Sequence, residues 1–189
     1  MRRFNGAPAA TVHEALLACC GSDRWAARIT AHRPYPDLAA LLAAADEAAY
    51  DLSPADLGRA LAAESAADRC AHASRTDVPQ AAATALRAGF AAYEASFGHT
   101  FVISLDGRAP DEYLGQVLAD IRTRLGNDPE EERAVAADEL RRLGRTRLGA
   151  LLTRLADGSD GLDGFDGDAP VGSPVVPAPG GAPEMPRPR

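Results

Sequence analysis

The stretch YEASFGHTFVISL, residues 93–105, interrupts a chain whose other apolar residues are mostly alanine and leucine. Alanine and leucine favour helix, whereas aromatic and β-branched residues favour extended backbone. Gly98 can adopt positive φ and therefore predicts the end of a helix that runs up to Phe97. The apolar run Phe101–Ile103 is too short for a buried helix, so the pattern predicts an extended segment between helices.

An extended segment inside a helical domain must find partners for its backbone N–H and C=O groups. One interpretation is that Phe97, Phe101 and Ile103 simply fill the core. The other is that the backbone groups bind a small polar ligand. The local pattern alone favours the first interpretation.

The composition around this stretch predicts one all-α domain. The chain has 189 residues, of which 46% are hydrophobic and only 5% aromatic, a balance that favours helices over sheets. All 20 basic residues are arginine, so Schiff-base chemistry through a lysine is excluded. The net charge of −7 argues against a nucleic-acid partner, because phosphate contacts need a positive face.

Location and metal content are predicted from what the sequence lacks. No apolar run approaches the length of a membrane span, and no h-region follows Arg2 and Arg3, so no secretory signal is expected. Cys19, Cys20 and Cys70 do not form a disulfide pattern, which predicts reduced thiols and a cytoplasmic protein. The four histidines show no zinc-ligand spacing with the cysteines, so no metal site is expected.

Capping motifs and helix breakers divide the chain. Helix starts are expected at Thr11–Glu14, Ser22, Asp37, Ser53–Asp56, Asp77–Gln80, Pro110 and Asp128–Pro129. About seven or eight helices in a single compact domain follow from this spacing. We expect a flexible N-terminus over residues 1–9, the helical domain over 10–156, and a disordered Gly/Pro/Asp-rich tail over 157–189. Residues 65–76 show no periodicity and predict a loop.

Two groups of side chains are candidates for chemistry. Arg147 lies amid the leucines of the last expected helix, where its guanidinium could clamp a carboxylate through two hydrogen bonds. The alternative, which spacing alone favours, is a structural arginine that holds helix carbonyls or a glutamate partner. Glu64 and Asp77 bracket the loop that contains His72. These three form either a general acid/base site or a solvated loop.

An ordered set of short motifs carries a resemblance to a known family. These motifs are CCGS (19–22), RW (24–25), RPY (33–35), YE (93–94), FG (97–98), FVI (101–103), RLGNDPE (124–130), Glu132, EL (139–140) and RL (147–148). The chain resembles the decarboxylases of 2-oxo-4-hydroxy-4-carboxy-5-ureidoimidazoline (OHCU), which are helical enzymes of uric acid degradation, over residues 10–155. Each motif alone is weak, but the ordered set is fairly specific.

The resemblance implies a cofactor-independent lyase of purine metabolism that decarboxylates OHCU to (S)-allantoin. It implies a small ureido-carboxylate substrate and a homodimer. Arg147 would bind the anionic group of the substrate. The backbone of the extended segment would bind the ring, through Phe101, Val102, Ile103, Ser104 and Leu105.

One position departs from the family pattern. Glu64 stands where the family has a catalytic histidine, followed there by a proline, and no Glu-Gln pair follows in the loop. Glu64, His72 or Asp77 would then handle the proton, whereas an ionised Glu64 would repel the substrate carboxylate. The alternative hypothesis is a catalytically lapsed helical module that binds a purine-breakdown product or a partner protein.

Overall fold

The computed structural model describes residues 1–64 and 80–158, and every regular element in these ranges is helical. The elements are α1 (Arg2–Gly6), α2 (Ala9–Cys20), α3 (Asp23–Ala31), α4 (Leu38–Tyr50), α5 (Pro54–Ala63), α7 (Gln80–Phe97), the 3₁₀ turn η1 (Pro110–Glu112), α8 (Tyr113–Arg124) and α9 (Pro129–Asp157). The predicted all-α class is confirmed. No helix in the described ranges combines the length and apolarity that crossing a membrane requires.

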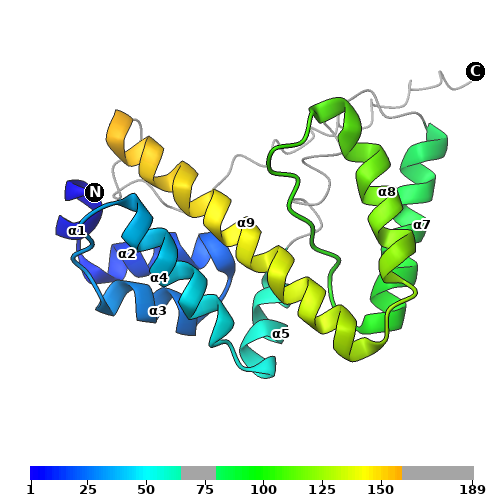
Figure 1. Ribbon diagram of the computed structural model, residues 1–189, viewed down its shortest axis with the longest axis horizontal. Coiled ribbons are helices and arrows are strands. Elements are labelled where there is room, and N and C mark those ends of the chain that lie inside the picture. Colours follow the sequence, from blue (N-terminus) through cyan, green and yellow to red (C-terminus); the bar gives the residue numbers. More distant parts are fainter. Residues whose placement is uncertain (65–79, 159–189) are drawn as a thin grey trace, which may run out of the picture.

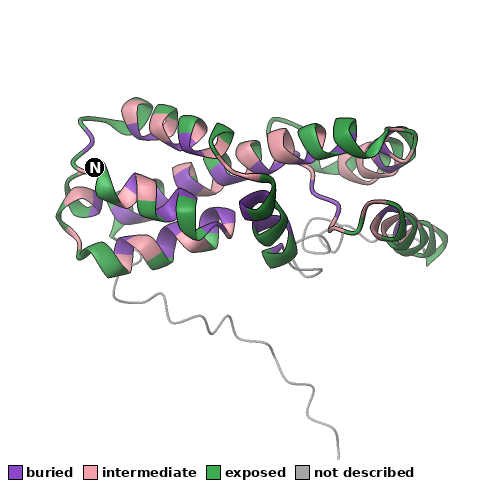
Figure 2. Cartoon of the chain, turned by 90° about the horizontal axis from the view of Figure 1, so that it is seen from below, coloured by how far each residue is buried: buried purple, intermediate pink, exposed green. Residues whose placement is uncertain are grey.

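The long helix α9 connects two groups of helices (Figure 1). Helices α1, α2 and α4 pack directly against α9, and α3 packs on α2 and α4. Helices α7 and α8 form a parallel pair near the N-terminal end of α9, in which Gly89 lies against Ile121 and Tyr93 against Arg124. The segment 98–109 runs between α9 and α8. Figure 2 shows buried residues on the sides of the helices that face one another and exposed residues on the outer sides.

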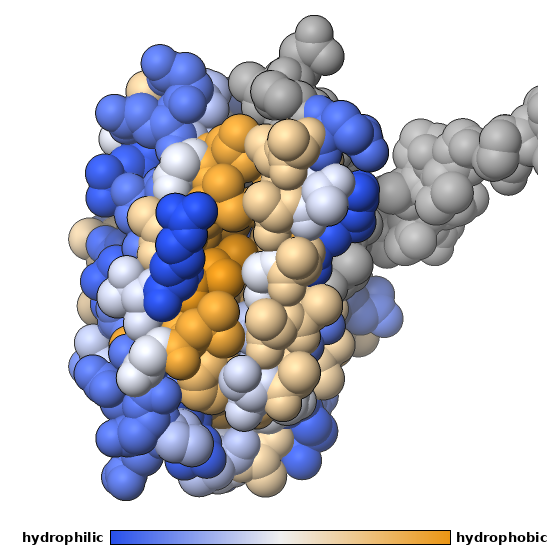
Figure 3. Space-filling model, turned by 90° about the vertical axis from the view of Figure 1, so that its right-hand side faces the viewer, coloured by the Kyte–Doolittle hydropathy of each residue, from blue (hydrophilic) through white to orange (hydrophobic). Residues whose placement is uncertain are grey.

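Two hydrophobic cores match these two groups. The larger core lies among α1–α5 and α9 and includes Trp25, whose Nε1 donates to the Ala45 carbonyl at 2.9 Å. The smaller core contains Tyr93, Phe101 and Ile121. Half-buried apolar side chains of α7 and α8 surround this smaller core, and Figure 3 shows an apolar band along the face that lies on this side of the molecule.

Most predicted helix starts are confirmed by their caps. The side chains of Ser22, Asp37, Ser53 and Asp128 each accept a hydrogen bond from a backbone N–H of the first turn of the helix that follows. Gly98 has φ of 71°, as its position after α7 predicts. The cap predicted at Asp77–Gln80, the loop 65–76 and all but the first two residues of the tail 157–189 lie outside the described residues.

The N-terminal prediction needs two corrections. The helix predicted to start at Thr11 begins at Ala9, so Thr11 lies inside α2 and caps nothing. Residues 1–9, expected to be flexible, include α1, and the Phe4 side chain is fully buried in the larger core. The reason is a long-range contact, because Arg33 Nη1 donates to the carbonyls of Phe4 and Ala7 at 2.8 and 2.9 Å.

A buried ion pair joins the smaller core to α9. Glu132 is fully buried, and its carboxylate accepts from Arg124 Nη2 at 2.6 Å, from Asn127 Nδ2 and from the Tyr93 hydroxyl. Burial raises the pKa of the Tyr93 hydroxyl, and the hydrogen bond to Glu132 raises it further, so the hydroxyl stays protonated. This network fixes the start of α9 relative to α7 and α8.

Replacing Glu132 by alanine should lower the free energy of unfolding by about 3–5 kcal/mol, because it leaves the Arg124 guanidinium buried and uncompensated. Urea denaturation followed by circular dichroism measures this. The exposed Glu131 of the same helix turn is the matched control, and its change to alanine should cost no more than about 1 kcal/mol. An equal loss of unfolding free energy in both variants would contradict a stabilising role for the buried Glu132–Arg124 pair.

Candidate active site

Arg147 of α9 and Glu64, the residue that caps the C-terminus of α5, form a two-point ion pair. Arg147 Nη1 donates to Glu64 Oε1 at 2.7 Å, and Nη2 donates to Oε2 at 2.8 Å. Nη1 also donates to the Cys19 carbonyl at the end of α2, at 3.2 Å. The Glu64 side chain is 7% exposed and that of Arg147 is 29% exposed. Three helix segments therefore meet at this guanidinium.

This geometry shows what Arg147 offers chemically. Both carboxylate oxygens accept from the planar fork of the guanidinium, the arrangement in which arginine binds a carboxylate most strongly. The structural alternative considered for Arg147, a glutamate partner, is what the structure shows. Since Glu64 here plays the part of a bound carboxylate, the same pair shows that Arg147 can hold one.

The segment 101–106 follows α9 toward Arg147. Ser104 N–H donates to Glu139 Oε2 at 2.6 Å, and Thr146 Oγ1 donates to Asp106 Oδ2 at 3.3 Å. Glu139 and Thr146 lie about two turns apart on α9, in the same order as their partners along the segment. The segment therefore ends beside Thr146, next to Arg147 in the chain.

Side chains of this segment alternate as extended backbone requires. Phe101 packs in the smaller core and Ile103 against it, whereas Val102 lies in the larger core. The apolar side chains thus fill the cores, as the first interpretation of this stretch predicted. The backbone is only partly used, since among the described residues no hydrogen bond forms at the N–H or C=O of Ile103. The two interpretations of the stretch are therefore compatible.

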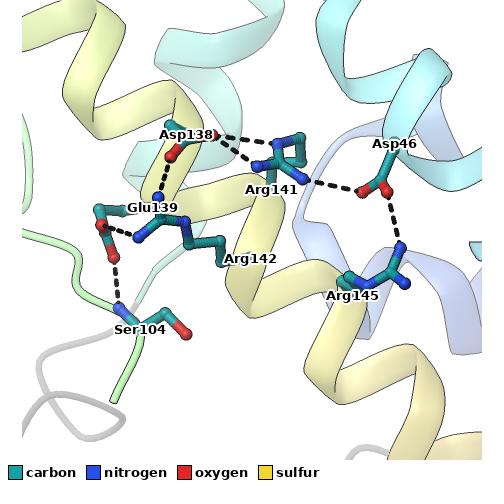
Figure 4. A network of polar contacts seen from close by, with 7 residues as sticks. All are labelled: Asp46, Ser104, Asp138, Glu139, Arg141, Arg142 and Arg145. Carbon is teal, nitrogen blue, oxygen red and sulfur yellow. Dashed lines mark hydrogen bonds and ion pairs between the residues drawn. The ribbon is translucent and has the colours of Figure 1, made fainter. Parts of the chain in front are cut away.

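A network of surface ion pairs joins α4 to α9 (Figure 4). Asp46 of α4 accepts from Arg141 at 3.2 Å and from Arg145 at 2.6 Å, and Asp138 accepts from Arg141 at 2.7 Å. Arg142 bridges Asp138 and Glu139. Arg145 is thereby assigned to a structural role that joins α4 to α9.

Two buried thiols lie beside the ion pair. Burial raises the pKa of Cys19 to about 11, with Arg147 acting in the opposite direction. Burial, together with the charge of Glu64, raises the pKa of Cys20 to about 12. Neither thiol is ionised at neutral pH, so neither is a nucleophile in the site.

We expect Cys19 and Cys20 to resist iodoacetamide in the folded protein at pH 8, because the thiol has to ionise and become accessible to react. Peptide mass spectrometry should find both unlabelled under native conditions. The same peptides from protein alkylated in urea provide the control and should be fully labelled. Rapid native labelling would show that the end of α2 opens.

The structure places some of the predicted site residues and not others. Glu64 and Arg147 are brought together, and the Phe101–Leu105 segment runs along the same helix. His72 and Asp77 lie outside the described residues. Within the described residues, no cluster of histidine, cysteine and acidic side chains could hold a metal ion. A cavity of about 270 Å³ between α2, α4, α5 and α9, lined by Cys20, Tyr50 and Leu57 among others, includes none of the predicted site residues.

The sequence analysis gave no functional role to three residues that hold the segment 101–106, either directly or through a neighbour. Arg124 donates to the Val102 carbonyl at 2.6 Å, Glu132 pairs with Arg124, and Glu139 accepts from Ser104. All three belong to motifs that carry the family resemblance. Their positions were therefore visible, but their partners lie 8 to 35 residues away in the chain.

The described residues thus form an all-helical domain in which an arginine–carboxylate pair joins α9 to the end of α5. The OHCU decarboxylase family model matches residues 5–149, and the chain belongs to this family. Family membership implies a carboxy-lyase.

Solved structures agree with this fold. One, described as OHCU decarboxylase in the presence of (S)-allantoin, superposes with a TM-score of 0.64 at 22% identity, covering 74% of this chain and 98% of that chain. A second, described as (S)-allantoin synthase, gives a TM-score of 0.63 at 18% identity, covering 79% of this chain and 52% of that one. No curated protein sequence matches this chain.

Proposed function

We propose that this chain decarboxylates OHCU to (S)-allantoin and CO2 in uric acid degradation, without a cofactor. The observation that carries the proposal is the family match over residues 5–149, joined to the position of Arg147 at the end of the Phe101–Leu105 segment. Arg147 supplies a carboxylate clamp, and the segment supplies backbone groups for a ring that carries amide-type N–H and C=O groups.

In this proposal the substrate carboxylate binds Arg147. Loss of CO2 breaks the bond between that carboxyl and the hydroxyl-bearing ring carbon, and the electron pair moves into the ring to form an enol with the neighbouring carbon, which carries the ureido group. Protonation takes place at that neighbouring carbon, and the hydroxyl-bearing carbon becomes the ring carbonyl of the product. A proton delivered to one face then gives a single enantiomer. Recognition of the ring by fixed backbone groups decides which face is presented.

Glu64 takes a specific part in this proposal. Its carboxylate occupies the fork of Arg147, which is the position that the substrate carboxylate needs. We assign it the role of an internal anion that the substrate displaces. The proton then comes from His72 or Asp77, the other two candidates that the sequence provides.

The experiment is the decay of freshly generated OHCU with and without the protein, followed by circular dichroism. Faster decay that yields (S)-allantoin supports the proposal. Unchanged decay to racemic product, with folded protein, contradicts it and leaves the non-catalytic module as the function. The homodimer and the cytoplasmic location belong to the same proposal. Light scattering of the purified protein tests the dimer, and fractionation of native cells tests the location.

A further inference from the structure

We propose that Arg124 and Glu139 are positioning residues, which fix the direction of the Ile103 backbone N–H and C=O so that these groups bind the substrate ring. The inference rests on the proposed function and adds two residues that act on the substrate through the backbone. Its basis is a pair of contacts on the two peptide groups that flank the Ile103 α-carbon.

The first contact holds the peptide group before Ile103. Arg124 Nη1 donates to the Val102 carbonyl at 2.6 Å, from a guanidinium that is almost fully buried. The guanidinium cannot move away from this carbonyl, because Nε and Nη2 donate to Glu132 at 2.9 and 2.6 Å. It also lies 4.4 Å from the centroid of the Phe101 ring, in cation–π distance.

The second contact holds the peptide group after Ile103. Ser104 N–H donates to Glu139 Oε2 at 2.6 Å, and the dashed line in Figure 4 marks this bond. The other oxygen of Glu139 accepts from Arg142 at 3.2 Å, which keeps the carboxylate in place on the surface of α9. A charged acceptor makes this hydrogen bond stronger than a bond between two backbone groups.

Because peptide groups are planar and trans, these two contacts fix the directions of the Ile103 N–H and C=O. In such a group the C=O and the N–H point in opposite directions. Holding the Val102 carbonyl against Arg124 therefore directs the Ile103 N–H away from Arg124. Holding the Ser104 N–H against Glu139 directs the Ile103 carbonyl away from Glu139.

The result is a donor and an acceptor on one residue, both with fixed directions. The alternating burial of residues 101–103 shows extended backbone, in which the N–H and C=O of one residue lie on the same edge. Neither group of Ile103 is bonded within the described residues. A cyclic ureide carries an adjacent N–H and C=O, so its edge is complementary to this pair. The ureide ring of the proposed substrate therefore fits this pair of groups.

The test compares variants of two adjacent acidic residues on α9. Glu139→Ala removes the acceptor for Ser104 N–H, and KM for OHCU should rise about tenfold, the usual size of one charge-assisted hydrogen bond. Glu139→Gln keeps an oxygen acceptor at this position and should restore KM to within about threefold of the wild-type value. Asp138→Ala is the matched control: it removes ion pairs with Arg141 and Arg142 but touches no residue of the segment, so KM should not change.

The enantiomeric ratio of the product distinguishes a loosely held substrate ring from a loss of folded protein. Arg124→Lys keeps the positive charge beside Glu132, but an ammonium cannot bridge Glu132 and Val102 as the guanidinium fork does. We expect enzyme-dependent product from this variant to be less enantiopure, because a loosely held ring presents both faces to the proton. Loss of folded protein alone lowers the amount of product and does not change its enantiomeric ratio, once spontaneous decay is subtracted.

The possible results distinguish failure of the positioning roles of Arg124 and Glu139 from failure of the proposed decarboxylase function. Active wild-type protein, with Glu139→Ala equal to Asp138→Ala in KM and in product ratio, overturns the positioning roles and leaves the decarboxylase intact. Wild-type protein that neither accelerates OHCU decay nor binds (S)-allantoin in calorimetry overturns both. If Arg124→Lys does not fold, the Glu139 series decides by itself.

Discussion

Replacement of Arg147 by alanine is expected to raise KM for OHCU enough to lower kcat/KM about 10²–10³-fold, because two charged hydrogen bonds to the substrate carboxylate are lost. Steady-state kinetics with freshly generated substrate measures this. The exposed Arg145, two residues earlier on α9, is the matched control. Its alanine variant breaks the ion pair with Asp46 and should leave KM unchanged.

The Arg147 variant also disturbs the fold, and the design has to separate this effect. Without its partner, the Glu64 carboxylate is left 7% exposed and uncompensated, which can cost several kcal/mol, less than for a fully buried pair because Arg147 is partly solvated. The double variant Glu64→Ala/Arg147→Ala removes both charges and should recover most of the stability. Its KM should nevertheless stay high. A double variant with wild-type KM would show that Arg147 only holds α5 and α2 together.

The parts of the fold that were predictable from sequence depend on short-range chemistry. Ser22, Asp37, Ser53 and Asp128 cap helices through hydrogen bonds two or three residues away, so the signal and the structure lie in the same few residues. Gly98 ends α7 for an equally local reason. These features follow from the sequence whatever the rest of the chain does.

The N-terminus shows why local patterns fail. Thr11 and Glu14 match a capping box, but α2 begins earlier, at Ala9. The preceding turn α1 is stabilised by Arg33, from beyond α3, and Asn5 exchanges hydrogen bonds with the Tyr35 backbone. Nothing within residues 1–9 signals these partners, so the polar start, which contains Gly6 and Pro8, predicts a flexible segment.

The candidate site was predictable in its members and not in its pairing. Arg147 and Glu64 were both singled out, but 83 positions separate them, and only the packing of α5 and α2 on α9 brings them into contact. The extended segment was recognised because its composition differs from its surroundings. Its anchors Arg124 and Glu139 were not, since a buried arginine and an exposed-looking glutamate on a helix resemble ordinary charged residues in sequence.

Replacement of Glu64 is expected to change KM as well, but here KM should fall, whereas it rises when Arg147 is replaced. Glu64→Gln keeps the side-chain volume but removes the charge that competes for Arg147. A substrate carboxylate then no longer has to displace another carboxylate from the guanidinium fork. We expect KM to fall about 10-fold or more, the scale of one or two charge-assisted hydrogen bonds, with kcat little changed. Glu47→Gln, at an exposed position of α4, makes the same charge change and should alter neither constant.

The same variant tests the competing role of Glu64 as the proton donor. A general acid that is replaced by an amide loses its transferable proton, and kcat then falls about 10²–10⁴-fold whatever happens to KM. A fall in KM at constant kcat therefore means that the Glu64–Arg147 pair is an internal mimic of the bound substrate. A collapse of kcat at constant KM means that the Glu64 carboxyl group donates the proton, the role that the family resemblance gives to a histidine at this position.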